Sequence, residues 1–105
     1  MKYGAMNFPI KPLLREIEEI GEMGFDYVEL TMDPPEAIPE KIIGQKRAIL
    51  EILQRYGMGV MGHLPTFVWT SDLYESLRRV SIQENIAALE AAAELGIEKM
   101  VLHPG

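Results

Sequence analysis

The two histidines of the chain, His63 and His103, each follow a short apolar segment and stand just before a proline-containing turn. They are forty residues apart, at equivalent points of two successive strand-like segments. Neutral imidazole binds Zn, Mn or Fe, or hydrogen-bonds a hydroxyl group, near pH 7. Because ligands of parallel α/β proteins gather at the carboxyl ends of the strands, this placement predicts one shared site.

Other side chains that could line such a site also follow predicted strands. Glu29 lies toward the end of one strand and either lines the site or forms an ion pair inside a barrel. Asn7 either contacts a substrate hydroxyl or forms a turn, whereas Asp33 is better explained as a turn former. Phe67 and Trp69 follow His63 and either stack on a sugar ring or cover the core. We expect Glu29, Asn7, Trp69 and Phe67 to bind substrate.

Strands and amphipathic helices alternate along the chain, which predicts a parallel sheet with right-handed crossovers. Glycines at 24, 57 and 96 are expected to end the three helices. The strands are expected at about residues 2–6, 25–32, 59–63 and 98–102, and the helices at 12–23, 40–56 and 73–95.

Apolar stripes on these helices predict the core. Met23 and Met58 are expected to belong to it, and the alanine-rich end of the third helix to approach the sheet closely. The apolar stripe of that third helix is predicted to contain Leu77, Val80, Ile86, Leu89 and Ala93.

Length and composition limit the classes of protein. The 105 residues predict a single domain, residues 1–105, and the net charge of −6 argues against a broad phosphate-backbone footprint. Cysteine is absent, which excludes disulfides and thiolate chemistry and fits a cytoplasmic protein. No signal peptide or membrane-spanning run is predicted.

Four parallel strands form an incomplete architecture. A doubly wound sheet would need helices on both faces and a glycine-rich loop after the first strand, and neither is indicated. The favoured interpretation is an α/β half-barrel, β-α-β-α-β-α-β, corresponding to half of an eight-stranded TIM barrel. Its two edge strands would be left open.

Three segments carry a family resemblance: residues 25–30, the turn at 62–65 (Gly-His-Leu-Pro) and the final Val-Leu-His-Pro-Gly at 101–105. They resemble the xylose isomerase-like TIM-barrel superfamily, which includes sugar and sugar-phosphate isomerases and epimerases and also endonuclease IV. The resemblance covers the first four strands of that barrel. In endonuclease IV-like members, histidines ending strands three and four bind zinc, which by motif are His63 and His103 here.

The resemblance implies the N-terminal half of a divalent-metal-dependent sugar or sugar-phosphate isomerase or epimerase, inactive alone. It implies a Zn or Mn ion incompletely liganded by His63 and His103, with the catalytic acids outside these residues. One alternative is an endonuclease IV-like AP endonuclease, a zinc phosphodiesterase, although the acidic charge makes a nucleic-acid partner less favoured. Another is a non-catalytic half-barrel whose strand edges pair with a second copy or with the missing C-terminal half.

Overall fold

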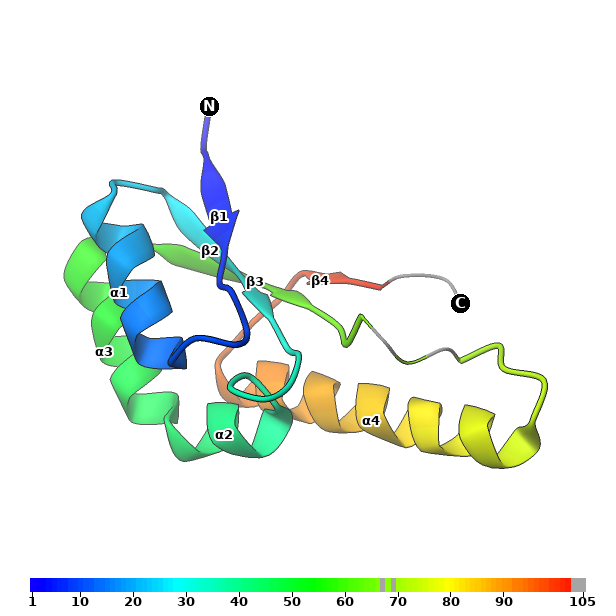
Figure 1. Cartoon of the computed structure of the whole chain (residues 1–105). Helices are drawn as coiled ribbons and strands as arrows, with labels where there is room; N and C mark the ends of the chain where they lie inside the picture. The colour runs from blue at the N-terminus through cyan, green and yellow to red at the C-terminus, as the bar shows by residue number, and fades with distance from the viewer. Residues whose placement is uncertain (67, 69, 103–105) are drawn as a thin grey trace.

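The computed structural model describes residues 1–66, 68 and 70–102. Four strands form one parallel sheet in the order β1-β2-β3-β4 (Figure 1). In chain order the elements are β1 (Gly4–Met6), α1 (Leu13–Glu22), β2 (Tyr27–Thr31), α2 (Pro39–Gly44), α3 (Lys46–Tyr56), β3 (Gly59–His63), α4 (Glu75–Glu94) and β4 (Met100–Val101). The α/β half-barrel expected from the sequence is confirmed.

Glycine ends the helices where the sequence predicts it. Gly24, Gly57 and Gly96 have φ values of 86°, 62° and 71°. These values lie in the left-handed region, which residues with a Cβ atom adopt only at a cost in free energy. Strand β3 also has the predicted bounds.

The single helix predicted over residues 40–56 is wrong, because the structure divides it into α2 and α3. Gln45 interrupts the helix with φ −111° and ψ 14°, directly after Gly44. The Gln45 side-chain Nε2 donates to the carbonyl of Lys41 at 3.0 Å. Glycine weakens a helix interior, so the chain changes direction at this point.

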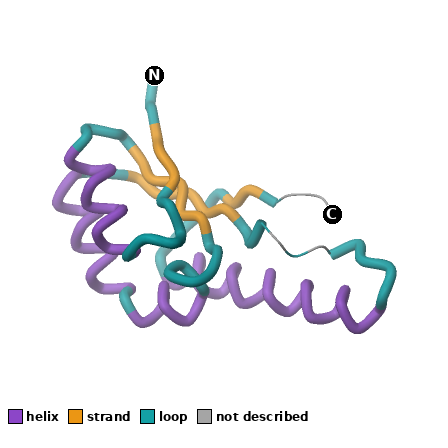
Figure 2. The backbone as a smooth tube through the Cα atoms, viewed as in Figure 1, coloured by secondary structure: helices purple, strands orange, loops and turns teal. Residues whose placement is uncertain are grey.

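The helices cover one side of the sheet and leave the other side bare (Figure 2). Val28 and Leu30 point toward the helices and are fully buried, together with Ile17 of α1 and Ile49 of α3. Between them along β2, Tyr27 and Glu29 point to the bare side and are only half-buried. The core is therefore one-sided. We call the bare side the open face.

Helix α4 packs differently from the prediction. Leu77, Val80, Ile86 and Leu89 are between 45% and 53% exposed, and Ala93 is exposed too. The buried stripe instead begins with polar residues and continues with alanines: Ser81, Asn85, Ala88, Ala91 and Ala92. Three of the alanines are thus buried, while their expected close approach to the sheet stays a prediction. Apolar residues lie on several faces of α4, so periodicity did not identify the packed one.

The structure confirms one of the two predictions for core methionines. Met58 is buried, as expected, but Met23 is 69% exposed and its assignment to the core is wrong. Met23 stands at the C-cap of α1, beyond the last helical turn, so the helical spacing that placed it on the core side no longer applies. No helix in the described part of the chain is long and apolar enough to span a membrane.

Gly21 of α1 packs tightly against Tyr56 of α3. A Cβ added there would lie 2.5 Å from the Tyr56 ring and 3.1 Å from Met58 Cε. Overpacking of this kind costs about 1–3 kcal/mol, more than the roughly 1 kcal/mol that a helical Gly→Ala change returns. Gly21→Ala should therefore lower stability in urea unfolding. Gly44→Ala is the control, since an added Cβ meets nothing within 4 Å, and it should be neutral or stabilising.

One exposed ion pair joins α3 to α4. Lys46 Nζ lies 2.9 Å from Glu94 Oε2, and this hydrogen bond and the positive charge of Lys46 hold the pKa of the Glu94 carboxyl below its ordinary value. A lowered carboxyl pKa contributes stability above the unfolded pKa that is lost as pH falls through the folded one. Glu94→Gln should lower the melting temperature slightly at pH 7 and not at pH 2. An equal loss at both pH values would contradict this account.

Candidate functional site

Buried polar side chains gather where β1, β2 and β3 end. Asn7, Thr31, Asp33 and His63 are 3%, 7%, 4% and 8% exposed, and Thr66 is half-buried beside them. We call these five residues the strand-end rim. Because the three strands are parallel and adjacent, the loops that follow them meet at one edge of the sheet.

His63 is the last residue of β3 and lies on the open face. It is the register partner of Thr31 in β2 and of Val101 in β4. Its Nδ1 is 3.0 Å from the carbonyl oxygen of Leu64. A carbonyl oxygen only accepts, so Nδ1 carries the proton of this bond, and in the neutral ring the lone pair then lies on Nε2. Imidazole in this tautomer can accept a hydrogen bond or ligate a metal through Nε2.

Asn7 joins the end of β1 to β2 through its side chain. Its Oδ1 accepts from the Thr31 backbone N–H at 2.7 Å, and its Nδ2 donates to the Thr31 carbonyl at 3.4 Å. The amide thus continues the β1–β2 pairing one residue beyond Met6. This gives Asn7 a structural role, and its predicted contact with substrate stays a prediction.

Asp33 joins the loop after β2 to the loop after β3. Its Oδ1 accepts from the Thr66 N–H at 2.8 Å and its Oδ2 from the Thr66 hydroxyl at 2.7 Å. The backbone N–H of Ala37 also bonds the Asp33 carbonyl at 3.0 Å, which closes the turn before α2. Asp33 is therefore more than the local turn former that the sequence suggested, because it fixes a loop 33 residues away.

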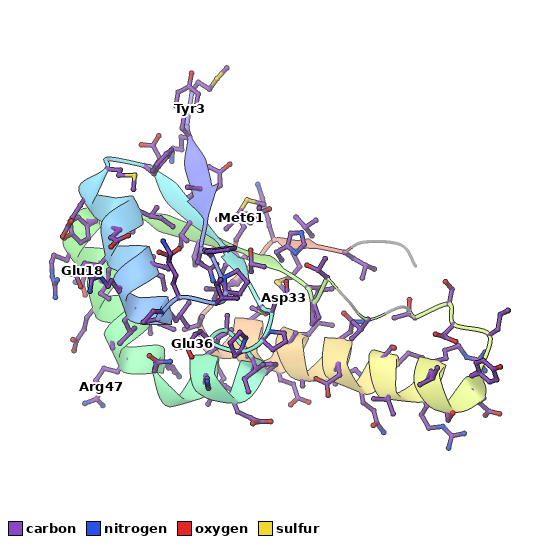
Figure 3. All side chains as sticks on the ribbon, in the orientation of Figure 1. Tyr3, Glu18, Asp33, Glu36, Arg47 and Met61 are labelled. Carbon is purple, nitrogen blue, oxygen red and sulfur yellow. The ribbon has the colours of Figure 1, made fainter. Side chains whose placement is uncertain are left out.

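Glu29 lies on the open face one pleat before Thr31, between Met6 and Met61 in register. Figure 3 shows Met61 on the side of the sheet away from the helices. Among the described residues no ion pair of Glu29 is found, so the barrel ion pair weighed for it is not formed within this part of the chain. Its position allows it to line a site bounded by the open face.

Three predicted site residues, Phe67, Trp69 and His103, lie outside the described residues. The meeting of His63 with His103, and the stacking of either aromatic ring on a sugar, stay predictions. Within residues 1–66, 68 and 70–102, no group of three or more His, Cys, Asp or Glu side chains gathers in a way that could hold a metal ion.

The hollows of the described surface do not locate the site. One of about 460 Å³ lies on the outer side of α2 and α3, lined by residues such as Ile43, Arg47 and Leu50. Another of about 210 Å³ lies between the loops after β2 and β3 and α4, below the roughly 300 Å³ at which ligand pockets begin. The strand-end rim is therefore the candidate site because of its buried polar groups and its place at the strand ends, and not because of a cavity.

Sequence reasoning missed Thr31 and Thr66. Thr31 is the last residue of β2 and shares a face with Glu29, so strand alternation could have placed it beside the site. No local signal could have identified Thr66, since its partner Asp33 is brought near only by the pairing of β2 with β3.

Four parallel strands with helices on one side define part of a (β/α) barrel, and the polar rim lies at the carboxyl ends of its strands. A sequence model of the xylose isomerase-like TIM barrel family matches residues 17–105. The chain belongs to that family.

The chain is also similar to individual proteins and solved structures. The uncharacterized protein MJ1311 of Methanocaldococcus jannaschii is 28% identical over 108 aligned positions, which cover 100% of this chain and 36% of the relative. The structure of a D-tagatose 3-epimerase-like protein matches with a TM-score of 0.77 and 26% identity, over 100% of this chain and 38% of the other. The 3-keto-D-glucoside 4-epimerase of E. coli shares the fold, with a TM-score of 0.71, 24% identity and coverage of 97% and 37%. The chain thus spans somewhat more than a third of each of these proteins.

Proposed function

We propose that this chain is the N-terminal half of a divalent-metal-dependent sugar or sugar-phosphate isomerase or epimerase and is inactive by itself. The observation that carries the proposal is the buried His63 at the end of β3, held with Nε2 as the acceptor nitrogen. The similarity to the structure of a D-tagatose 3-epimerase-like protein, at 26% identity over 100% of the chain, supports the same reaction class.

In the proposed enzyme the substrate lies over the carboxyl end of the sheet. The lone pair on His63 Nε2 either ligates the metal or accepts a hydrogen bond from a sugar hydroxyl. Glu29, Phe67 and Trp69 shape the pocket. The acid and base that move the substrate proton between carbon centres belong to the part of the barrel that this chain does not cover.

The proposed metal needs more ligands than the described residues supply. A catalytic zinc ion takes about three protein ligands and a water molecule, whereas His63 is the single imidazole in the described rim. We place His63 and His103 as two ligands at most.

The open face gives a physical reason for a further part of the barrel. Parallel sheets are normally buried on both faces, yet here Met6 is 56% exposed on the open face. We propose that this face and the edges of β1 and β4 meet the remaining strands, supplied by a C-terminal half or by a second chain.

A chimaera tests the proposed function. This chain would replace the matched 37% of the E. coli 3-keto-D-glucoside 4-epimerase, and the product would be assayed for 4-epimerisation. We expect measurable turnover, with a fall of about 10- to 100-fold in kcat/KM on His63→Ala. Gln54→Ala, at an exposed site on α3, is the matched control. A folded chimaera that is active and indifferent to His63→Ala would overturn the role given to this residue.

Metal content is a second test, made on the purified 105-residue chain. We expect sub-stoichiometric binding of Zn or Mn that falls on His63→Ala and again on His103→Ala, measured by elemental analysis after dialysis. Unchanged metal content in both variants would remove the ligand assignment. The AP endonuclease alternative stays a prediction, and the charge of −6 gives it no support.

A further inference from the structure

Thr31 has a buried hydroxyl with no hydrogen-bond partner among the described residues. The residue is 7% exposed, and its Oγ1 atom is covered yet unpaired. An unsatisfied buried hydroxyl costs stability, and such groups in native structures call for an explanation. A hydroxyl could be satisfied by almost any polar neighbour, so its isolation here is informative.

The backbone of Thr31 is held by residues at the ends of both neighbouring strands. The Asn7 amide holds both backbone polar groups of Thr31 on the β1 side. On the β3 side, the Met32 N–H donates to the carbonyl of His63 at 3.1 Å. The backbone is thus fixed from both strands, which leaves rotation about χ1 as the freedom of the Thr31 side chain.

Strand register places Thr31 directly beside His63. The two residues are partners in the β2–β3 pair and therefore share the open face, with their strands about 4.8 Å apart. The Thr31 hydroxyl can donate, and His63 Nε2 in the tautomer set by Leu64 can accept. A staggered change of χ1 turns the hydroxyl outward in exchange for the methyl group.

We propose that Thr31 is a second ligand-binding residue of the site, acting with His63 on one hydroxyl group of a polyol. The Thr31 O–H donates to the oxygen of that hydroxyl, and the hydroxyl donates its own proton to His63 Nε2. The inference rests on the proposed function for its ligand class, a sugar, and on the alternative in which His63 Nε2 binds the substrate and does not ligate the metal. It explains why a polar group is kept unpaired at this point of β2, where valine would fit the same volume.

Thermal unfolding of the 105-residue chain gives the first test and needs no ligand. Thr31→Val removes the hydroxyl at constant shape, so we expect a melting temperature at or above that of the wild type, by about 4 °C or more if the full penalty is relieved. Thr31→Ser keeps the hydroxyl and should not show this gain. A clear loss on Thr31→Val would mean that the hydroxyl already has a structural partner and would overturn the inference.

Binding of D-tagatose to the same chain gives the second test, followed by NMR of the Thr31 methyl group and the His63 ring. We expect about 3- to 10-fold weaker binding for Thr31→Val and near-normal binding for Thr31→Ser. Equal sugar binding by the wild type and Thr31→Val would overturn the role of Thr31 and leave the proposed sugar site intact. Wild-type chain that binds no sugar, while its melting behaviour is normal, would overturn the proposed sugar site and this assignment with it.

Discussion

Asp33→Ala is expected to lower the free energy of unfolding by about 2–4 kcal/mol, because it removes the acceptor of two short hydrogen bonds in a nearly dry position. The Thr66 N–H and hydroxyl lie 2.8 and 2.7 Å from the two carboxylate oxygens, and Asp33 is 4% exposed. Urea unfolding followed by circular dichroism measures the loss.

Two variants separate the hydrogen bonds from the volume of the Asp33 side chain. Asp33→Asn keeps an acceptor for the Thr66 N–H and offers an amide donor to its hydroxyl, so most of the stability should return. Thr66→Val removes the hydroxyl alone and should cost about 1 kcal/mol. If Asp33→Asn were as damaging as Asp33→Ala, the carboxylate charge rather than the bonding pattern would be responsible.

The Asp33–Thr66 contact also matters for the site, since Thr66 follows His63 by three residues. Trp69 is the single tryptophan of the chain and stands three residues further on. Its fluorescence is therefore a reporter for the loop after β3. We expect Asp33→Ala to change the Trp69 emission under native conditions, and Asp33→Asn to restore it.

Local signals predicted most of the fold. Glycines 24, 57 and 96 mark helix ends because left-handed backbone is a property of the residue itself. The β3 bounds and His63 at its end follow from a short apolar segment closed by proline. The break at Gln45 was missed because the apolar spacing continues through it from Ile42 to Ile49.

Long-range pairing accounts for what the sequence did not predict at the site. Asn7 bonds Thr31 across 24 residues and Asp33 bonds Thr66 across 33, so each contact exists only after the strands have paired. Local reasoning could name Asn7 and Asp33 as polar residues near strand ends. It could not tell that their side chains hold other parts of the rim together.

Helix α4 shows a related limit. Leu77, Val80, Ile86 and Leu89 look like a core stripe, yet they are about half exposed, while Ser81 and Asn85 face inward. In a chain that spans about a third of its relatives, apolar residues that would pack on absent elements cannot be told from core residues by spacing alone. The exposed apolar residues of α4 are therefore consistent with the proposal that further elements of a barrel pack on this chain.

A pair of substitutions on the two sides of the sheet tests this one-sided core. Leu30 is fully buried against the helices, so Leu30→Ala should cost about 2–5 kcal/mol in the isolated chain. Met61 lies on the open face and is half-buried, so Met61→Ala should cost less than about 1 kcal/mol in the same urea experiment.

The difference in stability loss between Met61→Ala and Leu30→Ala should shrink once the open face is covered. The same pair of substitutions therefore tests the half-barrel as well as the fold. In the chimaera with the C-terminal part of the E. coli enzyme, Met61 should be enclosed, and Met61→Ala should approach the cost of Leu30→Ala. Met61→Ala that is already as damaging as Leu30→Ala in a monomeric isolated chain would contradict an open face. A concentration-dependent cost would instead identify a second copy as the partner, because association then stabilises the folded chain by mass action.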